Sequence, residues 1–183
     1  SEYDDIFSTE HGPNGGDEVN YNGAPGKSEI ENFGWPISSY GGHYNVSSHE
    51  LIDNEMQLKE NREASQYTLA PLYKSHSKYG FIEPIITFSP SVGISQIIEV
   101  KNNFINNKSH RTFAFGTMGG EITKFMPSKS IFFISIDKDN NLLSKTQLIM
   151  NERMRDMIYY PENNMIIFAG DSSGVIGVMR PVS

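Results

Sequence analysis

The sequence contains no cysteine among its 183 residues. Disulfide bonds are therefore excluded, and no thiolate can act as a nucleophile or as a zinc ligand. No apolar run approaches the ~20 residues that a helix needs to span a bilayer. Basic residues number 15 against 22 acidic ones, and the net charge of -7 argues against nucleic acid, whose phosphates need a basic face.

The first twelve residues, SEYDDIFSTEHG, lack the basic and apolar stretches of a signal peptide. They run directly into an expected strand, which predicts that the chain is a portion of a longer protein. A hydrophobic fraction of 37% and a mean hydropathy of -0.43 predict a soluble, folded protein of one domain or part of one.

Short apolar stretches separated by turn residues make up most of the sequence. This pattern predicts an all-β protein of the sandwich, barrel or propeller type. A polar surface excursion is expected at about 45–70, within which Ser48 could instead cap a short helix from Glu50. The expected strands are 6–9, 18–21, 81–88, 95–100, 112–117, 130–136, 142–150, 154–160, 165–169 and 175–179.

The segment from Glu10 to Tyr44 has the highest density of special-purpose residues. Glycines near His11 allow positive φ and a close approach of the backbone to a ligand. The run HGPNGGDE predicts a shaped loop followed by two carboxylates, Asp17 and Glu18. Carbonyl and carboxylate oxygens are the ligands that calcium prefers. A tight surface turn that binds nothing is the alternative interpretation.

A second cluster of charge is Glu152-Arg153-Met154-Arg155-Asp156. On a strand, Arg153 and Arg155 would point to the same face. Two guanidinium groups on one face can bind a carboxylate or another planar anion. The alternative is a solvated edge on which Glu152 and Asp156 are the counter-ions.

The run beginning at Asp137 imitates the opening of a calcium-binding EF-hand loop. Leu142 and Leu148 stand where that loop needs glycine and a bidentate glutamate. We therefore predict a hairpin turn here, without calcium.

Four motifs in this order, EHGPNGGDE, FGWPISSYGGHY, SPSVGISQI and ERMRDMIY, resemble the soluble PQQ-dependent glucose/sorbosone dehydrogenases, the aldose sugar dehydrogenases. The resemblance implies a six-bladed β-propeller of four-stranded antiparallel sheets. At about 40–50 residues a blade, residues 1–183 would form a single C-terminal part of the propeller domain, about its last three to four blades. Such a part would expose edges that invite pairing with another copy.

The resemblance also implies two calcium ions. The backbone carbonyls of Gly12 and Pro13 would hold the calcium that binds PQQ. Glu18 and the carbonyl of Phe33, where the family usually has tyrosine, would serve a structural calcium.

The cofactor PQQ is a tricarboxylate, and the resemblance implies that Arg153 and Arg155 bind its carboxylates. Tyr44 would contact PQQ as well. The family often has lysine at the position of Gly119, and Lys124 stands farther along the same loop. The Arg-Asn pair with which the family contacts PQQ from an earlier blade has no counterpart in this chain.

The implied reaction is oxidation of an aldose at the anomeric carbon to a lactone. A histidine base takes the hydroxyl proton, hydride passes to PQQ, and electrons leave to an external acceptor. That histidine lies upstream of the HGP motif in the family, so no catalytic residue is assigned in this chain, and His11 is not given the role. We expect the chain alone to be inactive.

The family also implies a periplasmic or secreted location. A non-catalytic, calcium-binding propeller that binds carbohydrate or protein is the competing hypothesis. The paired arginines favour the enzyme, because a simple binding module has no need of two cations aimed at a tricarboxylate.

Overall fold

The computed structural model describes residues 4–12, 16–23, 25–26, 31–34, 40, 44–45, 50–51, 80–88, 91–105, 109–119 and 129–181. These residues form antiparallel sheets with one short 3-10 helix, so the predicted all-β class is confirmed. The chain divides into two compact units, Ser1–Ser91 and Val92–Ser183, which are described separately below.

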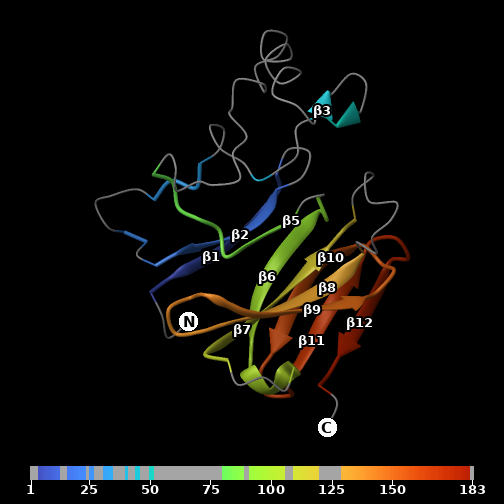
Figure 1. Cartoon of the computed structure of the whole chain (residues 1–183). Helices are drawn as coiled ribbons and strands as arrows, with labels where there is room; N and C mark the ends of the chain where they lie inside the picture. The colour runs from blue at the N-terminus through green and yellow to red at the C-terminus, as the bar shows by residue number, and fades with distance from the viewer. Residues whose placement is uncertain are drawn as a thin grey trace. The chain divides into compact units, whose positions relative to one another are not determined.

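Unit 1 contains a three-stranded sheet in the order β1-β2-β5, formed by Ile6–Glu10, Asp17–Asn22 and Ile86–Phe88 (Figure 1). The central strand β2 is buried from Asp17 to Asn20 because a strand covers each of its edges. Phe7 and Tyr21 are cross-strand partners, and their ring centroids lie 5.0 Å apart. Residues 81–85, expected to be part of a strand, precede β5 without joining it.

Two short strands, β3 (Tyr44–Asn45) and β4 (Glu50–Leu51), pair with each other within the expected polar excursion. The alternative of a helix starting at Glu50 is therefore wrong, since Glu50 pairs with Asn45 in a ladder. Ser48 and residues 52–79 lie outside the described part of the chain.

Unit 2 contains a four-stranded meander in the order β6-β7-β8-β9 (Figure 1). Every residue of β7 and β8 is buried, whereas nearly all of β9 is exposed. The buried Arg111 is neutralised by Glu99, whose two oxygens accept from Nε and Nη2 at 2.8 Å each. The strands are Ile94–Val100, Arg111–Thr117, Ser130–Ile136 and Leu142–Ile149, with the 3-10 helix Asn102–Ile105 between the first two.

A second sheet of unit 2 has the order β10-β11-β12, formed by Met154–Tyr160, Met165–Gly170 and Val175–Met179. Strand β10 lies against β6 and β7. Gly116 of β7 allows this approach, because a Cβ there would lie 2.5 Å from the Cβ of Met154.

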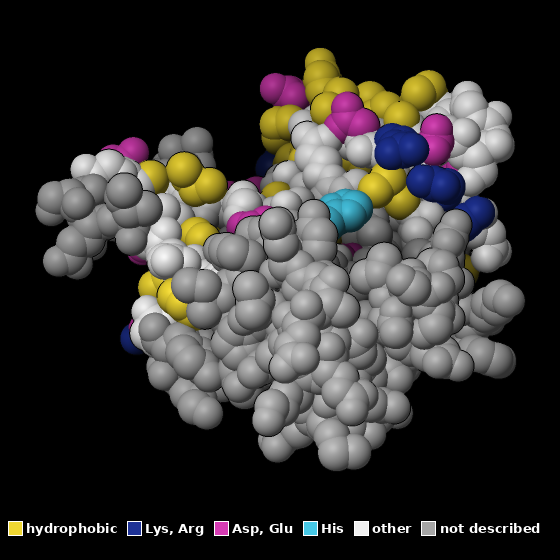
Figure 2. All heavy atoms as spheres, turned by 90° about the horizontal axis from the view of Figure 1, so that it is seen from above, with side chains coloured by type: hydrophobic (Ala, Val, Ile, Leu, Met, Phe, Trp, Pro, Cys, Tyr) yellow, Lys and Arg dark blue, Asp and Glu magenta, His cyan; other side chains and the backbone are white. Residues whose placement is uncertain are grey.

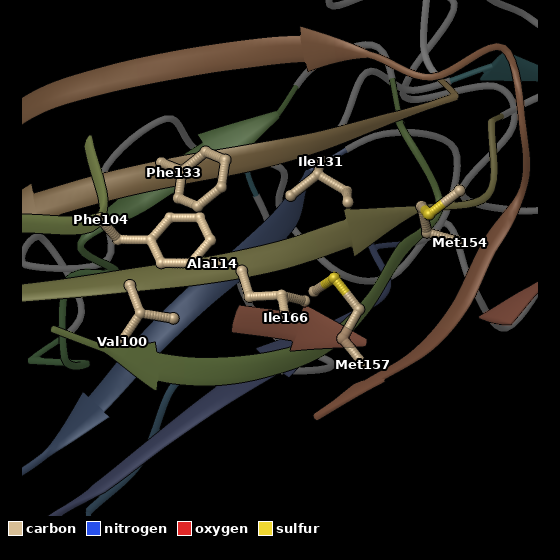
Figure 3. Close-up of a cluster of buried hydrophobic side chains, with 8 residues drawn as sticks. All are labelled: Val100, Phe104, Ala114, Ile131, Phe133, Met154, Met157 and Ile166. Atoms are coloured by element: carbon tan, nitrogen blue, oxygen red, sulfur yellow. The ribbon is translucent and has the colours of Figure 1, made fainter. Parts of the chain in front are cut away.

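The core of unit 2 joins the two sheets (Figure 3). Phe104 and Phe133 stack with ring centroids 5.6 Å apart, and Met154, Met157 and Ile166 come from the second sheet. Burial of apolar surface at ~25 cal/mol per Å² is the main force that holds such sheets together.

The predicted strands after residue 90 are all observed, with ends that differ by at most one residue. The Asp137 turn joins β8 to β9, as predicted, and its carboxylate accepts from the backbone N–H groups of Asp139 and Asn141. A four-stranded antiparallel meander is the blade that the propeller prediction requires, and the closed ring stays a prediction. Among the described residues, no helix is long and apolar enough to cross a membrane.

Candidate cofactor and metal sites

Arg153 and Arg155 converge on one carboxylate, that of Asp171. Arg155 contacts Asp171 Oδ2 through Nε and Nη2, each at 3.0 Å, and Nε of Arg153 lies 3.5 Å from the same oxygen. At 3.5 Å the latter contact is an ion pair without a hydrogen bond, so the buried Nε of Arg153 has no hydrogen-bond partner among the described residues. The cluster therefore retains unused donor capacity.

The convergence arises from a β-bulge rather than from simple alternation. Strand β10 begins at Met154, so Arg153 precedes it, and the register with β11 skips Arg155. Bulges redirect side chains at the ends of strands. The predicted common direction of the two guanidinium groups is thus observed for a different structural reason.

The carboxylate of Glu152 holds the turn that carries Asp171. It accepts from the backbone N–H groups of Arg153, Ser172 and Ser173 and from the Ser173 hydroxyl, the last at 2.6 Å. The Ser173 hydroxyl is the main cause that lowers the pKa of Glu152 to about 2. Glu152 is thereby kept ionised and fixed on the turn.

Gly170 makes room for this contact, since a Cβ there would lie 2.4 Å from Cγ of Glu152. Gly174 closes the turn with a φ of 68°, a conformation that glycine adopts without strain. The turn is therefore shaped by glycine at both ends.

In the alternative interpretation, the solvated edge is observed, since the side chains of Arg153 and Arg155 are 41% and 50% exposed, but the counter-ions are not Glu152 and Asp156. Glu152 bonds to the turn, and Asp156 accepts from the N–H of Met157 at 2.8 Å. The counter-ion is Asp171, which the hairpin between β11 and β12 brings to the arginines from sixteen residues beyond Arg155.

The loop after β7 reaches the same arginine. Nη1 of Arg155 lies 3.0 Å from Sδ of Met118, which is next to Gly119. The expected position of the family lysine is therefore adjacent to this cluster, while Lys124 lies outside the described residues. Figure 2 shows basic side chains next to acidic ones on the face seen from above, with hydrophobic side chains around them.

In unit 1, Asp17 fixes the loop that contains Gly12. Its fully buried carboxylate accepts from the N–H of Gly12 at 3.1 Å and from the Ser91 hydroxyl at 2.7 Å. The direction of the Gly12 peptide is thus set by β2. Pro13 lies outside the described residues, so the predicted carbonyl pair is described at Gly12 alone.

Glu18 lies in a buried polar row that crosses the sheet. It is opposite Glu10 in the register, and the Asn20 amide nitrogen donates to Oε1 of Glu10 at 3.1 Å and to Oε2 of Glu18 at 3.2 Å. Ser8 donates to Glu10 as well. The Oδ1 of Asn20 is buried and has no hydrogen-bond partner among the described residues.

Facing carboxylates repel each other, and a buried oxygen without a donor is costly. Oxygen-rich surroundings of this kind suit a hard cation. Within the described part of the chain, no group of three or more His, Asp or Glu side chains is close enough to hold a metal ion by itself. The predicted calcium ligands Gly12, Pro13 and Phe33 are backbone carbonyls, to which this absence of a side-chain cluster does not apply.

Phe33 lies in the described segment 31–34, which is tied to unit 1 by a hydrogen bond from the N–H of Ile82 to the carbonyl of Asn32. Tyr44 is placed only by its backbone in β3, and its side chain is outside the described set. Trp35, expected in the core, is also outside it.

The antiparallel sheets define an all-β protein. Unit 1 contains a row of carboxylate and amide side chains, and unit 2 contains two arginines beside one carboxylate. Residues 1–65 match the family model described as Glucose / Sorbosone dehydrogenase. The resemblance to this family is thereby confirmed over the segment that contains Gly12, Glu18 and Phe33.

Among curated proteins, the uncharacterized protein slr1608 of Synechocystis sp. (strain ATCC 27184 / PCC 6803 / Kazusa) is 20% identical over 169 residues. The match covers 92% of this chain and 32% of that protein. The chain thus spans about a third of the length of this relative. No solved structure matches the chain significantly.

Asp171, Asn20 and Glu10 belong to these clusters without having been predicted from the sequence. Asn20 could have been found, because Glu18 and Asn20 are two apart on a strand and so share a face. Asp171 could not, because only the pairing of β10 with β11 brings it beside Arg153.

Proposed function

We propose that this chain is part of a PQQ- and calcium-dependent sugar dehydrogenase that oxidises an aldose at the anomeric carbon to a lactone. The observation that carries the proposal is the convergence of Arg153 and Arg155, which offers two cations to one anion. The family match over residues 1–65 supports it independently.

The two arginines would hold carboxylates of the cofactor. Nε of Arg153 is buried beside Asp171, so the terminal N–H groups of this guanidinium are the ones that a ligand would reach. Guanidinium groups bind carboxylates through parallel N–H bonds, so the donor set fits a polycarboxylate. When bound, PQQ would supply the two-electron acceptor that no amino-acid side chain provides.

Unit 1 would supply calcium ligands. Asp17 orients the Gly12 peptide, and Glu18, Glu10 and Asn20 gather acceptor oxygens on one face of the sheet. These donor atoms fit calcium, which takes six to eight oxygen ligands in flexible geometry. The carbonyls of Pro13 and Phe33 would supply further calcium ligands, and Tyr44 would contact PQQ.

The catalytic base would be a histidine outside this chain, and the electrons would leave to an external acceptor. We propose a periplasmic or secreted location, in keeping with the family. An aldose is the expected substrate, and its identity would depend on loops from the other blades.

The test uses the complete reading frame, purified and reconstituted with PQQ and calcium. We expect aldose-dependent reduction of an artificial electron acceptor, with formation of lactone, and no activity when PQQ or calcium is omitted. Arg153→Ala with Arg155→Ala should abolish the activity. Lack of sugar oxidation by the reconstituted protein, with PQQ bound, would contradict the proposal and favour a non-catalytic propeller.

A further inference from the structure

We propose that Asp171 is a positioning residue for Arg153 and Arg155, an inference that rests on the cofactor role proposed above for the two arginines. Asp171 would set the direction and spacing of both guanidinium groups before an anionic ligand arrives. Pre-organised ligand-binding side chains generally depend on such outer partners.

Asp171 lies at the Nε edge of each guanidinium. It contacts Arg155 through Nε and Nη2 and lies 3.5 Å from Nε of Arg153. A guanidinium is planar with five N–H donors, so an acceptor at the Nε edge orients its plane. At Arg155, Nη2 also contacts Asp171 and Nη1 lies beside Sδ of Met118, and each of these nitrogens keeps a second N–H for a ligand. For Arg153, the one ion pair found among the described residues is that of Nε with Asp171.

Charge gives the second reason. Two adjacent guanidinium groups repel each other, and a single carboxylate oxygen shared between them offsets this repulsion. Without Asp171 the two half-exposed arginines would separate into solvent. A ligand would then have to restrict both long side chains again on binding, at an entropic cost.

Asp171 is itself held rigidly, as a positioning residue must be. Its backbone N–H donates to the carbonyl of Arg153 at 2.9 Å. Glu152 fastens the next two residues, Ser172 and Ser173, through their backbone N–H groups. The turn is thus held at two points, Arg153 and Glu152, to the segment that bears the arginines.

The test compares Asp171→Ala with Asp139→Ala in the same chain, folded and loaded with calcium. Asp139 is an exposed carboxylate in the β8–β9 turn, so both variants lose one negative charge. We expect Asp171→Ala to weaken PQQ binding roughly tenfold, the effect of losing an outer partner, and Asp139→Ala to leave it unchanged. Calorimetry at about 0.1 M and about 1 M salt, where the screening length falls from ~10 Å to ~3 Å, separates positioning from long-range charge effects. The ratio of the PQQ dissociation constants of Asp171→Ala and the wild type should be the same at both salt concentrations.

Unchanged or tighter PQQ binding by Asp171→Ala would overturn the inference, because Asp171 would then be neutral or a competitor of the ligand. A second measurement keeps the question separate from the proposed function. The Nε–H signals of Arg153 and Arg155 in ¹⁵N NMR spectra should be resolved in the wild type and in Asp139→Ala, and averaged in Asp171→Ala. If the wild type fails to bind PQQ, the cofactor proposal is contradicted. Independently of PQQ binding, unaltered Nε–H signals in Asp171→Ala would overturn the positioning role.

Discussion

At the residue scale, the chemistry of unit 2 depends on carboxylates that have separate tasks. Glu152 holds a turn, Asp171 holds two arginines, and Asp156 bonds to its own neighbour's N–H. The three are close in space, yet only Asp171 compensates the charge of Arg155. Each task follows from which donors the backbone presents to the carboxylate, and residue type alone does not reveal it.

Glu152→Gln tests the turn through its pH dependence. The folded-state pKa of about 2 lies below the ordinary glutamate value of 4.5, so Glu152 stabilises the fold above pH 4.5 and loses this effect as the pH falls towards 2. We expect the variant to have a lower free energy of unfolding than the wild type at pH 7. This difference should disappear as the pH falls from 4.5 to 2. Urea denaturation at several pH values measures it. Glu162→Gln, in an exposed turn, is the control, and a gap that persists at pH 2 would contradict this account.

Asp17→Ala tests the link between β2 and the glycine loop. Loss of a buried acceptor removes the hydrogen bonds that the N–H of Gly12 and the Ser91 hydroxyl donate to it, at a cost of about 1–3 kcal/mol. Hydrogen exchange at the Gly12 amide should accelerate, whereas Asp4→Ala, at an exposed carboxylate, should not affect it. Unchanged protection of Gly12 in Asp17→Ala would show that another group holds the loop.

At the scale of elements, alternation and turn residues were sufficient to predict the strands of unit 2. The hydrophobic run SIFFISI predicted β8, and Asp137 predicted the turn that follows it. The bulge at Arg155 was not predictable, since it depends on the register between β10 and β11. Within the predicted excursion, the alternative of a helix at Glu50 was wrong, because propensity is a weak guide where two short strands can pair.

Gly116→Ala tests the close approach of β7 to β10. The added methyl group would lie 2.5 Å from Cβ of Met154 and 2.6 Å from Oγ of Ser95, so one strand must shift. Overpacking of this kind typically costs about 1–3 kcal/mol, measured by urea denaturation. Ile158→Ala, on the exposed face of the same β10, should cost clearly less. Equal losses would mean that the two strands do not depend on this glycine.

At the scale of the whole molecule, unit 2 exposes apolar side chains on one face of its three-stranded sheet. Ile158, Ile167 and Val178 form a row across the sheet, and Ile176 is 70% exposed. A shallow cavity of ≈ 170 Å³ lies over Ile158, Ile167 and Ile176. Apolar patches of this kind favour association.

Ile176→Lys should therefore reduce self-association of the chain without lowering its stability, because the substitution adds charge at an exposed edge strand. Sedimentation velocity over a range of concentrations measures the effect, with Thr146→Lys on the exposed strand β9 as the control. If the wild type remains monomeric at all concentrations, this face does not mediate association between copies.

The most direct test of the proposed site is a calorimetric titration of PQQ into this chain with and without calcium. The wild type is compared with the Arg153→Ala, Arg155→Ala double variant. The account predicts calcium-dependent binding that the double variant loses, since the two guanidinium groups would supply the main contacts to the cofactor's carboxylates. Binding that survives loss of both arginines, or that is absent from the folded wild-type chain, would contradict it.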